Sequence, residues 1–599
     1  MRKRLQKWAS KGIVTGLAIA LLAACSSTTN NPAPANNKDN TQVQEGNTAP
    51  TTQEKYTLYH PHQTTPINLN GPITKEIMDH MGFNWEKVEI GNGSDIAQQV
   101  NLKLVGGNFP DVILLAPDSL IWSRLIDEDR VLALDDYFNQ PEQYPNLAKI
   151  DKRIIDSWRA SDGHIYFIPS FYEPVVEEPS AWQGNAQGLW IQSGLAEQAG
   201  LSVESLGTIE GLEAYLAAVK QMKDTQGRDM IPLSLGGENF AGLEYVMSMF
   251  GVHLSAGGTG WNEQADGSLI PDYQTKGFKQ AFQWLNKLHL QGLIDPETSF
   301  HKRDLFLEKT NSLRFGAMIF NGWDNPNLTI LANNDLPASI TYSELEKQGF
   351  PEGWYVPLKL PAVGDIKPVQ HASFNPFGGM GTGISKDVKN PEALIKGLDW
   401  LHTPEAFILM EYGPESMGAY KMEDGVVVVN QDVFQGPEFW GGDGMANATE
   451  KGFWWWKQLG STIATHIPTL EAPWTATNAM LYKAEQLNQE QGTFGLSPAV
   501  NRTKARVGGS VEKYSPVQND IRMQYYAKLL LAKNEAEFDT IFNQFLNEMK
   551  VRGHDEETIA EFNAEYQAYI QTPAGQIEID VKRTMPRNVF SNKAEAIGR

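Results

Sequence analysis

The pattern of apolar and polar residues in the N-terminal part of the folded chain changes period several times. Alternation every second residue is typical of strands, whereas apolar residues three or four apart are typical of amphipathic helices. The chain shows these patterns in turn, with a strand at 56–59, a helix at 73–81, a strand at 85–90, a helix at 95–104 and a strand at 112–115. This order predicts an α/β fold with a mostly parallel sheet.

The first 55 residues do not show such a pattern. Met1-Arg2-Lys3-Arg4 is basic, and residues 12–24 form a short uncharged apolar run that ends in small residues. This combination is typical of a secretory signal peptide and is too short for a transmembrane helix. Residues 26–55 contain almost no apolar side chains, which predicts a flexible tether.

Cys25 is the only cysteine of the chain and directly follows the apolar run. Leu22-Ala23-Ala24-Cys25 resembles a bacterial lipobox, which implies removal of residues 1–24 and lipidation of Cys25 with a diacylglycerol and an amide-linked chain such as palmitate. Two lipid signals on one residue anchor a protein stably. We therefore expect a lipoprotein on the extracellular face of the cell membrane. An ordinary signal peptide followed by a chance cysteine is the alternative.

Composition narrows the function classes. The chain has 599 residues, of which 41% are hydrophobic and 20% charged, as in soluble proteins of more than one domain. The net charge of −22 argues against nucleic acid as a partner and against a broad anionic membrane surface. The 16 tryptophans offer flat apolar faces that suit either sugar rings or a packed core.

Several motifs follow one another in a fixed order. They are Asn108-Phe109-Pro110-Asp111, then 132–137, 163–169, 188–191, 314–319 and 390–393. In this order they resemble the extracellular solute-binding proteins of carbohydrate ABC importers (family 1 type). The length of the chain, the motif at 411–415 and the tail at 538–569 are similar to the large lipoprotein branch of Gram-positive soil bacteria.

The resemblance implies an α/β, two-lobe periplasmic-binding-protein-like fold of type II, with a ligand cleft between the lobes. Lobe 1 would comprise residues 56–170 and 375–425, and lobe 2 residues 171–374 and 426–599. The crossing segments would lie near 168–172, 374–381 and 420–429. The glycine-rich stretch 374–383 fits a hinge whose backbone changes conformation, and it fits a static turn equally well.

A sugar site combines aromatic faces with charged or amide groups, because sugar rings have apolar faces edged by hydroxyls. The resemblance implies carboxylates at Asp118 and Glu173 and an aromatic platform at Trp323. The candidate ligand-binding residues are His62, Gln63, Asp118, Tyr172, Glu173, Trp190, Asn321, Trp323, Asp324, Trp440 and Trp455. Three consecutive tryptophans, 454–456, point about 100° apart on a helix, so at least one should pack in the core.

Metal binding is not expected. His60 and His62 also fit turn or core positions, and no third ligand at matching spacing indicates zinc. Several long relatives carry a calcium loop just after the helix that corresponds to 209–222. Here the loop Lys223-Asp224-Thr225-Gln226-Gly227-Arg228-Asp229-Met230 has two carboxylates and an arginine, whereas Ca²⁺ takes six to eight oxygen ligands.

Enzymatic function is the weaker hypothesis. The chain lacks Gly-x-Ser-x-Gly, His-Glu-x-x-His and Gly-Lys-Ser/Thr motifs. Glycoside hydrolysis needs only two carboxylates, and Glu173, Glu177 and Glu178 are close in sequence, so a secreted polysaccharide hydrolase stays an alternative. A sensory or adhesive surface lipoprotein is another. We expect a monomeric binding protein without catalytic residue or cofactor, which captures an oligosaccharide and delivers it to the permease subunits of an ABC transporter.

Overall fold

The structure is a computed structural model that describes residues 53–579 with gaps. The gaps are 64–65, 92–95, 117–120, 161, 171, 173–187, 225, 237–239, 241, 255–259, 301, 321, 323–324, 338–339, 370–377, 435, 437, 440–443, 454, 461–475, 491–498, 501–502, 504 and 507. The expected signal peptide, Cys25 and almost all of the expected tether lie outside the described residues. Among the described residues, none of the helices has the length and apolar content that a membrane span requires.

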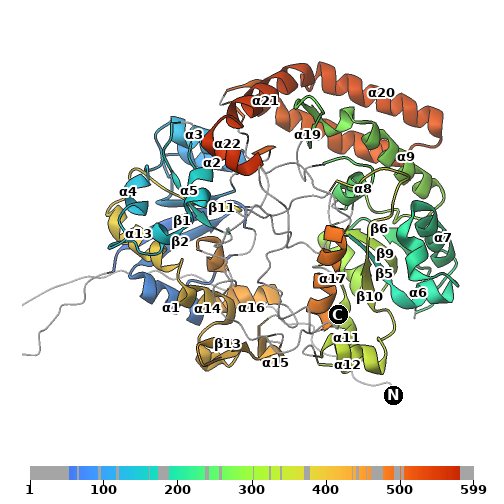
Figure 1. Cartoon of the computed structure of the whole chain (residues 1–599), viewed down its shortest axis with the longest axis horizontal. Coiled ribbons are helices and arrows are strands. Elements are labelled where there is room, and N and C mark those ends of the chain that lie inside the picture. The colour runs from blue at the N-terminus through green and yellow to red at the C-terminus, as the bar shows by residue number, and fades with distance from the viewer. Residues whose placement is uncertain are drawn as a thin grey trace, which may run out of the picture. The chain divides into compact units, whose positions relative to one another are not determined.

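The first sheet has five strands in the order β2-β1-β3-β11-β4 (Figure 1). Its strands are β1 (Lys55–His60), β2 (Asn84–Ile90), β3 (Val112–Leu115), β4 (Phe167–Ser170) and β11 (Met380–Ile384). β1 runs parallel to β2 and β3, whereas β11 is antiparallel to β3 and β4. The strand predictions at 56–59, 85–90 and 112–115 are confirmed, and β3 is buried along its whole length, as its continuous apolar run predicts.

Helices surround this sheet, and the first two confirm the predictions at 73–81 and 95–104. They are α1 (Pro72–Met81), α2 (Ile96–Val105), α3 (Ile121–Asp127), α4 (Asp135–Phe138), α5 (Lys152–Ser157), α13 (Pro391–Trp400) and α14 (Pro404–Tyr412). α1 packs against α13 and α14, and α2 packs against α3. α1 begins with a proline at its first position and ends at Gly82 in the left-handed conformation, so local sequence sets both of its ends.

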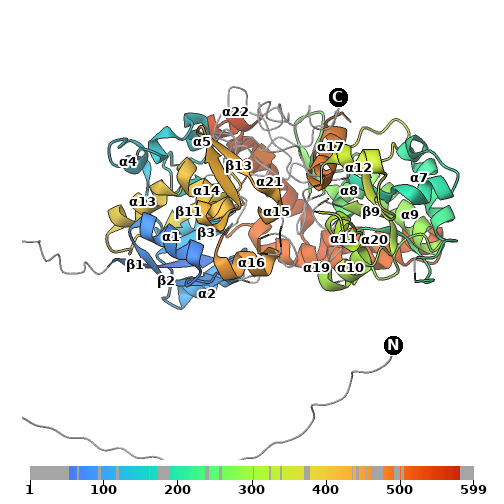
Figure 2. The ribbon, with the colours of Figure 1, turned by 90° about the horizontal axis from the view of Figure 1, so that it is seen from below.

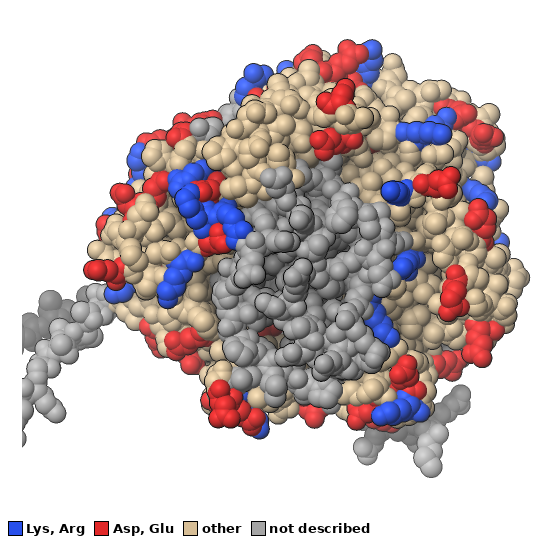
Figure 3. Space-filling model, in the orientation of Figure 1, with Lys and Arg blue, Asp and Glu red and all other residues tan. Residues whose placement is uncertain are grey.

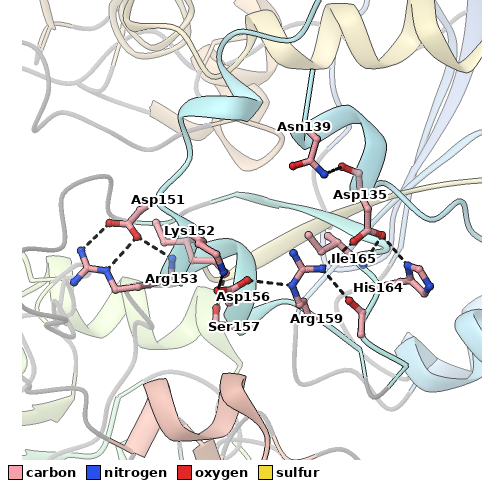
Figure 4. Close-up of polar contacts among 12 residues, drawn as sticks. Asp135, Asn139, Asp151, Lys152, Arg153, Asp156, Ser157, Arg159, His164 and Ile165 are labelled. Atoms are coloured by element: carbon pink, nitrogen blue, oxygen red, sulfur yellow. Dashed lines mark hydrogen bonds and ion pairs between the residues drawn. The ribbon is translucent and has the colours of Figure 1, made fainter. Parts of the chain in front are cut away.

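The motif at 163–169 forms a polar turn on the first lobe (Figure 4). The Asp135 carboxylate accepts hydrogen bonds from the Arg159 guanidinium (2.8 Å), His164 Nδ1 (3.1 Å) and the backbone N–H of Ile165 (3.2 Å). Burial alone would raise the pKa of Asp135, but these donors outweigh it and lower the pKa. The turn therefore fixes how the chain enters β4.

The second sheet has four strands in the order β10-β5-β9-β6. Its strands are β5 (Gly188–Gln192), β6 (Ile231–Ser234), β9 (Phe315–Phe320) and β10 (Tyr355–Leu358). β6 is parallel to β9, and β5 is antiparallel to both β9 and β10. A short hairpin of β7 (Trp261–Glu263) and β8 (Leu269–Pro271) lies outside this sheet.

The second lobe contains more helix than the first (Figures 1 and 2). Its helices are α6 (Ser193–Gln198), α7 (Ile209–Val219), α8 (Leu243–Met249), α9 (Lys276–Leu290), α10 (Arg303–Asn311), α11 (Asn327–Asn333), α12 (Tyr342–Gln348), α17 (Ala476–Glu490), α19 (Ser510–Leu530), α20 (Glu535–Val551) and α21 (Asp555–Tyr569). α19 packs on α9, α20 and α21, and the buried pair of Arg522 with Asp272 (2.7 Å) fixes α19 beside the start of α9.

Each sheet lies in its own hydrophobic core, and these cores correct part of the expected lobe boundary. Residues 426–459 were expected in lobe 2, but Val427, Phe453 and Trp456 are buried in the core around the first sheet. The physical reason is side-chain packing: Trp456 stacks on Trp85 of β2 at 6.1 Å between centroids and donates its Nε1 hydrogen to Thr74 Oγ1 (3.3 Å).

The end of the described chain departs from the expected boundary in the same way. α22 (Pro573–Ile579) contacts α5, and its Ile577 packs against the first core. Between residues 420 and 459 lie β12 (Tyr420–Glu423), β13 (Val426–Val429), α15 (Gln431–Phe434), α16 (Gly444–Lys451) and the 3₁₀ helix η6 (Trp455–Gln458). The other predicted boundaries stay predictions.

The glycines of β11 serve close packing. A Cβ at Gly381 would collide with the indole of Trp158, and one at Gly383 would lie 2.7 Å from Cε1 of Phe167. Trp158 and Phe167 both pack on Trp122, so this aromatic cluster has little room to move. For 380–383 the structure favours the static alternative, while 374–377 lie outside the described residues.

We expect Gly381→Ala to lower the free energy of unfolding by about 1–3 kcal/mol, because the added methyl overpacks a rigid aromatic cluster. Gly194→Ala is the matched control, since Gly194 lies in α6 with open space around its Cα. The control should leave stability unchanged or raise it by up to about 1 kcal/mol. Thermal melting of both variants checks this, and equal melting temperatures would contradict the packing role of Gly381.

Candidate functional site

The candidate site lies at one edge of the first sheet. β1, β3 and β4 run in the same direction, so their carboxyl ends, at His60, Leu115 and Ser170, meet there with Met380 at the start of β11. Ligands of open α/β sheets bind at the carboxyl ends of strands. Three candidate residues, His62, Gln63 and Tyr172, follow these strand ends within a few positions.

A buried hydrogen-bond network holds this edge together. The side-chain oxygen of Gln458, at the end of η6, pairs with Nε2 of His60. The hydroxyl of Ser170 lies 2.6 Å from the backbone oxygen of Gln458 and 3.1 Å from that of Met380. We call this set of His60, Ser170, Met380 and Gln458 the edge network. It fixes η6, and with it Trp455, against the ends of three strands.

His60 is neutral in this network. An amide oxygen only accepts, so Nε2 of His60 carries the hydrogen and Nδ1 is an acceptor. Burial lowers the pKa of His60 to about 3, which the bond to Gln458 opposes and the neighbouring His62 reinforces. Nδ1 is buried without a hydrogen-bond partner among the described residues. The edge therefore encloses an uncharged imidazole rather than a cation.

His62 and Gln63 lie on the turn after β1. The backbone N–H of Ala116, just after β3, donates to Nε2 of His62 (3.2 Å), and the N–H of Gln63 donates to the oxygen of His60 (3.2 Å). Both side chains are half-buried. The turn thus joins the ends of β1 and β3, and the expected ligand contacts of His62 and Gln63 stay predictions.

Two other candidates are core residues in this structure. Tyr172 is buried, with its hydroxyl 2.9 Å from Nδ1 of His402 and its ring stacked on that imidazole. Trp190 is fully buried in the middle of β5, between β9 and β10. Neither ring has an exposed face for a sugar, because each packs in the core of its own lobe. The structure places both rings in the cores, and their predicted ligand contacts stay predictions.

The tryptophan run at 454–456 behaves as its spacing predicts. Trp456 is fully buried against Trp85, which confirms that at least one of the three packs in the core. Trp455 is also buried, at 4% exposure, and lies in the same short helix as Gln458. Trp455 and Trp456 lie in a 3₁₀ helix rather than an α-helix. Trp455 stays a predicted ligand contact.

The remaining candidates cannot be placed. Asp118, Glu173, Asn321, Trp323, Asp324 and Trp440 lie outside the described residues. The described strands that precede Asp118 and Asn321 end at Leu115 and Phe320, so both follow the carboxyl end of a strand, as the sequence predicts.

Sequence reasoning missed Ser170, His402 and Gln458. Ser170 could have been found from the sequence, because it directly follows the motif at 163–169. In the structure it is the last residue of the buried strand β4, at the sheet edge. His402 and Gln458 had none, since their partners Tyr172 and His60 are 230 and 398 residues away.

On the face drawn in Figure 3, a group of basic side chains lies left of the centre, and acidic and basic side chains are interspersed elsewhere. Among the described residues, no three His, Cys, Asp or Glu side chains lie close enough together to hold a metal ion. The described part of the site thus consists of neutral hydrogen-bonding groups and aromatic rings.

Acid should weaken the first lobe through His402. Burial lowers its pKa to about 3, whereas an unfolded histidine has a pKa near 6.5. Stability is therefore complete above about pH 6.5 and falls as the pH drops towards 3, because only the unfolded chain takes up the proton, at about 1.4 kcal/mol per pH unit.

We expect His402→Gln to reduce the loss of melting temperature between pH 7.5 and pH 5.0, because the variant has no imidazole to protonate at this position. Its melting temperature at pH 7.5 should also fall, since the bond to Tyr172 is altered. His289→Gln, on the half-exposed side of α9, is the control and should keep the pH slope of the wild type. The same slope in His402→Gln and the wild type would show that His402 is protonated in the folded state.

We compared the sequence and the fold with those of known proteins. No protein-family model matches the chain. The fructooligosaccharide ABC transporter substrate-binding protein FusA of Streptococcus pneumoniae is 25% identical over 352 residues, which span 54% of this chain and 59% of FusA. The match therefore covers less than two thirds of that relative.

Two solved structures share the fold over most of the chain. A human-milk-oligosaccharide (HMO) binding, ABC-transporter-associated solute binding protein from Bifidobacterium longum infantis has a TM-score of 0.64 at 15% identity and covers 86% of this chain and 99% of its own. A FusA EF-hand mutant from S. pneumoniae in complex with fructo-nystose has a TM-score of 0.60 at 17% identity, with 87% and 99% covered. These comparisons confirm the two-lobe α/β fold and the resemblance to solute-binding proteins of carbohydrate ABC importers that the sequence predicts.

Proposed function

We propose that this protein is the extracytoplasmic substrate-binding protein of an ABC importer and that it captures an oligosaccharide. The observation that carries the proposal is the fold shared over 86% of the chain with an oligosaccharide-binding transporter protein. The similarity of sequence to FusA points to the same class of ligand.

The chemistry of the sheet edge suits such a ligand. Sugars offer hydroxyl groups that donate and accept hydrogen bonds, together with apolar ring faces. The buried edge network is neutral, and η6, which carries Trp455, is fixed to it through Gln458. A neutral edge also avoids the cost of removing a charged group from water when an uncharged ligand binds.

Lobe closure would convert binding into a signal for transport. A ligand that contacts both lobes binds the closed state more tightly and so shifts the population towards it. The permease subunits would then recognise the closed form. We propose that a lipid on Cys25 and the tether after it keep the binding protein close to the permease on the outer face of the membrane, which raises the effective concentration of each for the other.

Binding without catalysis distinguishes this proposal from its alternatives. A polysaccharide hydrolase would release reducing sugar from a polymer, and its candidate pair among Glu173, Glu177 and Glu178 would be required. A sensory or adhesive lipoprotein would bind sugar, yet its deletion would leave sugar uptake unchanged. Measurements of sugar release by purified protein and of uptake by a deletion strain separate the three.

A panel of oligosaccharides should identify the ligand. Fructooligosaccharides, human milk oligosaccharides and other plant and microbial oligosaccharides are tested by thermal shift, because a ligand present at about 100 times its Kd stabilises the folded form by about 2.7 kcal/mol. Small-angle scattering should then show a smaller radius of gyration with the ligand that binds. Saturable binding without compaction would contradict the closure mechanism.

Trp323→Ala should weaken binding of that oligosaccharide by at least about tenfold, since one lost aromatic contact with a sugar is worth roughly 1.5 kcal/mol or more. Trp400→Ala is the control, because Trp400 stacks on His80 on the outer side of the first lobe, at 4.7 Å between centroids. Isothermal titration checks both variants. Unchanged affinity in Trp323→Ala would remove Trp323 from the site.

Cys25→Ser should release the protein from the membrane, because serine offers no thiol for the diacylglycerol. After fractionation of cells, we expect the wild type with the membrane and the variant in the medium. A variant that stays with the membrane would contradict lipidation at Cys25.

A further inference from the structure

The loop between α7 and β6, residues 223–230, is the position where the family resemblance implies a calcium loop. The solved FusA variant described above carries a mutated EF-hand, which is a helix–loop–helix calcium site. In this chain the loop is closed by its own backbone: the N–H of Asp224 donates to the oxygen of Arg228 (2.9 Å), and that of Gly227 to Asp224 (2.9 Å).

Both oxygens of the Asp224 carboxylate accept hydrogen bonds from N–H groups of this chain. One oxygen accepts the backbone N–H groups of Gln226 (2.9 Å) and Arg228 (2.8 Å), and the other accepts Nε of Arg228 at 2.6 Å. Nε of Arg314 lies 3.7 Å from the same oxygen. The Asp224 side chain is only 2% exposed. Its lone pairs are thus directed at N–H groups of this chain, and a metal ion would have to displace them.

The second carboxylate of the loop is also engaged. Asp229 forms an ion pair with Lys223, and its backbone oxygen accepts a hydrogen bond from Arg314 (3.1 Å). Two carboxylates therefore face three cationic side chains, those of Lys223, Arg228 and Arg314. Ca²⁺ requires six to eight oxygen ligands with several carboxylates among them, and this excess of positive charge would repel it. The residues present do not fit a calcium ion.

We propose that the Arg228 guanidinium takes the place of the cation in this loop, so that the loop holds its shape without metal. The arrangement has a structural role in the second lobe. Arg314 directly precedes β9, and its backbone oxygen accepts the N–H of Ile231 at the start of β6 (2.8 Å). The ion pairs around Asp224 thereby fasten the amino ends of two parallel strands, whose register begins at Ile231 and Phe315.

Two measurements on the purified full-length protein test the proposal. The first compares thermal melting in excess EGTA with melting in millimolar CaCl₂, together with calorimetric titration of CaCl₂. We expect equal melting temperatures and no saturable heat, because the carboxylates are already paired. A melting temperature that rises with Ca²⁺ and returns with EGTA would overturn the proposal.

The second measurement substitutes the arginine. Arg228→Met, assayed in EGTA, should lower the melting temperature by at least about 3 °C, since a buried carboxylate loses its charged partner. Arg552→Met is the matched control. Arg552 forms an exposed ion pair with Glu548 (2.7 Å) on α20, and its loss should cost less than about 1 °C. Equal, small effects of both substitutions would show that Arg228 does not replace a cation.

Discussion

The first lobe depends on a strand that arrives late in the sequence. β11 inserts between β3 and β4 and pairs Met380 with Ser170 across 210 residues. The chain must therefore leave the first sheet after β4, form the core of the second lobe and return. Both crossings consequently start from neighbouring strand ends. This pairing also requires β11 to lie closely on Trp158 and Phe167, which is why Gly381 and Gly383 have no side chain.

The same return brings polar groups together at the sheet edge. Ser170 ends β4 and bonds to Met380 at the start of β11, and Gln458 reaches Ser170 and His60 from a segment still later in the chain. Buried polar groups are costly when unpaired, so such a network tolerates few arrangements of its members. A neutral imidazole costs less to bury than a charged one. The edge network is therefore rigid, and in the proposed function it would hold the ends of β1 and β4 in fixed positions for a ligand that binds beside them.

Sequence patterns predicted the helices and strands that depend on consecutive residues. The helix at 73–81 and the buried strand at 112–115 follow from the sequence pattern, because the apolar residues that define each element lie within one short stretch of the chain. The packing of Trp456 on Trp85, which moves residues 426–459 into the first lobe, joins segments about 370 residues apart and leaves no periodic signal. Tyr172 was predicted to contact the ligand because of its position after β4, yet it pairs with His402, which lies 230 residues away.

Both lobes contain pairs of buried polar groups. The described first core contains neutral pairs such as Tyr172 with His402, whereas the second encloses the full ion pair of Arg522 with Asp272, at 2% and 0% exposure. A buried ion pair adds little net stability to the fold. It is costly to break, because removing either partner leaves the other charge buried without a counter-charge. The Arg522–Asp272 pair joins α19 to the turn before α9, and the Arg228–Asp224 pair closes the loop before β6. Both lobes thus have internal constraints that resist deformation, so the proposed ligand-driven motion would move each lobe as a rigid unit.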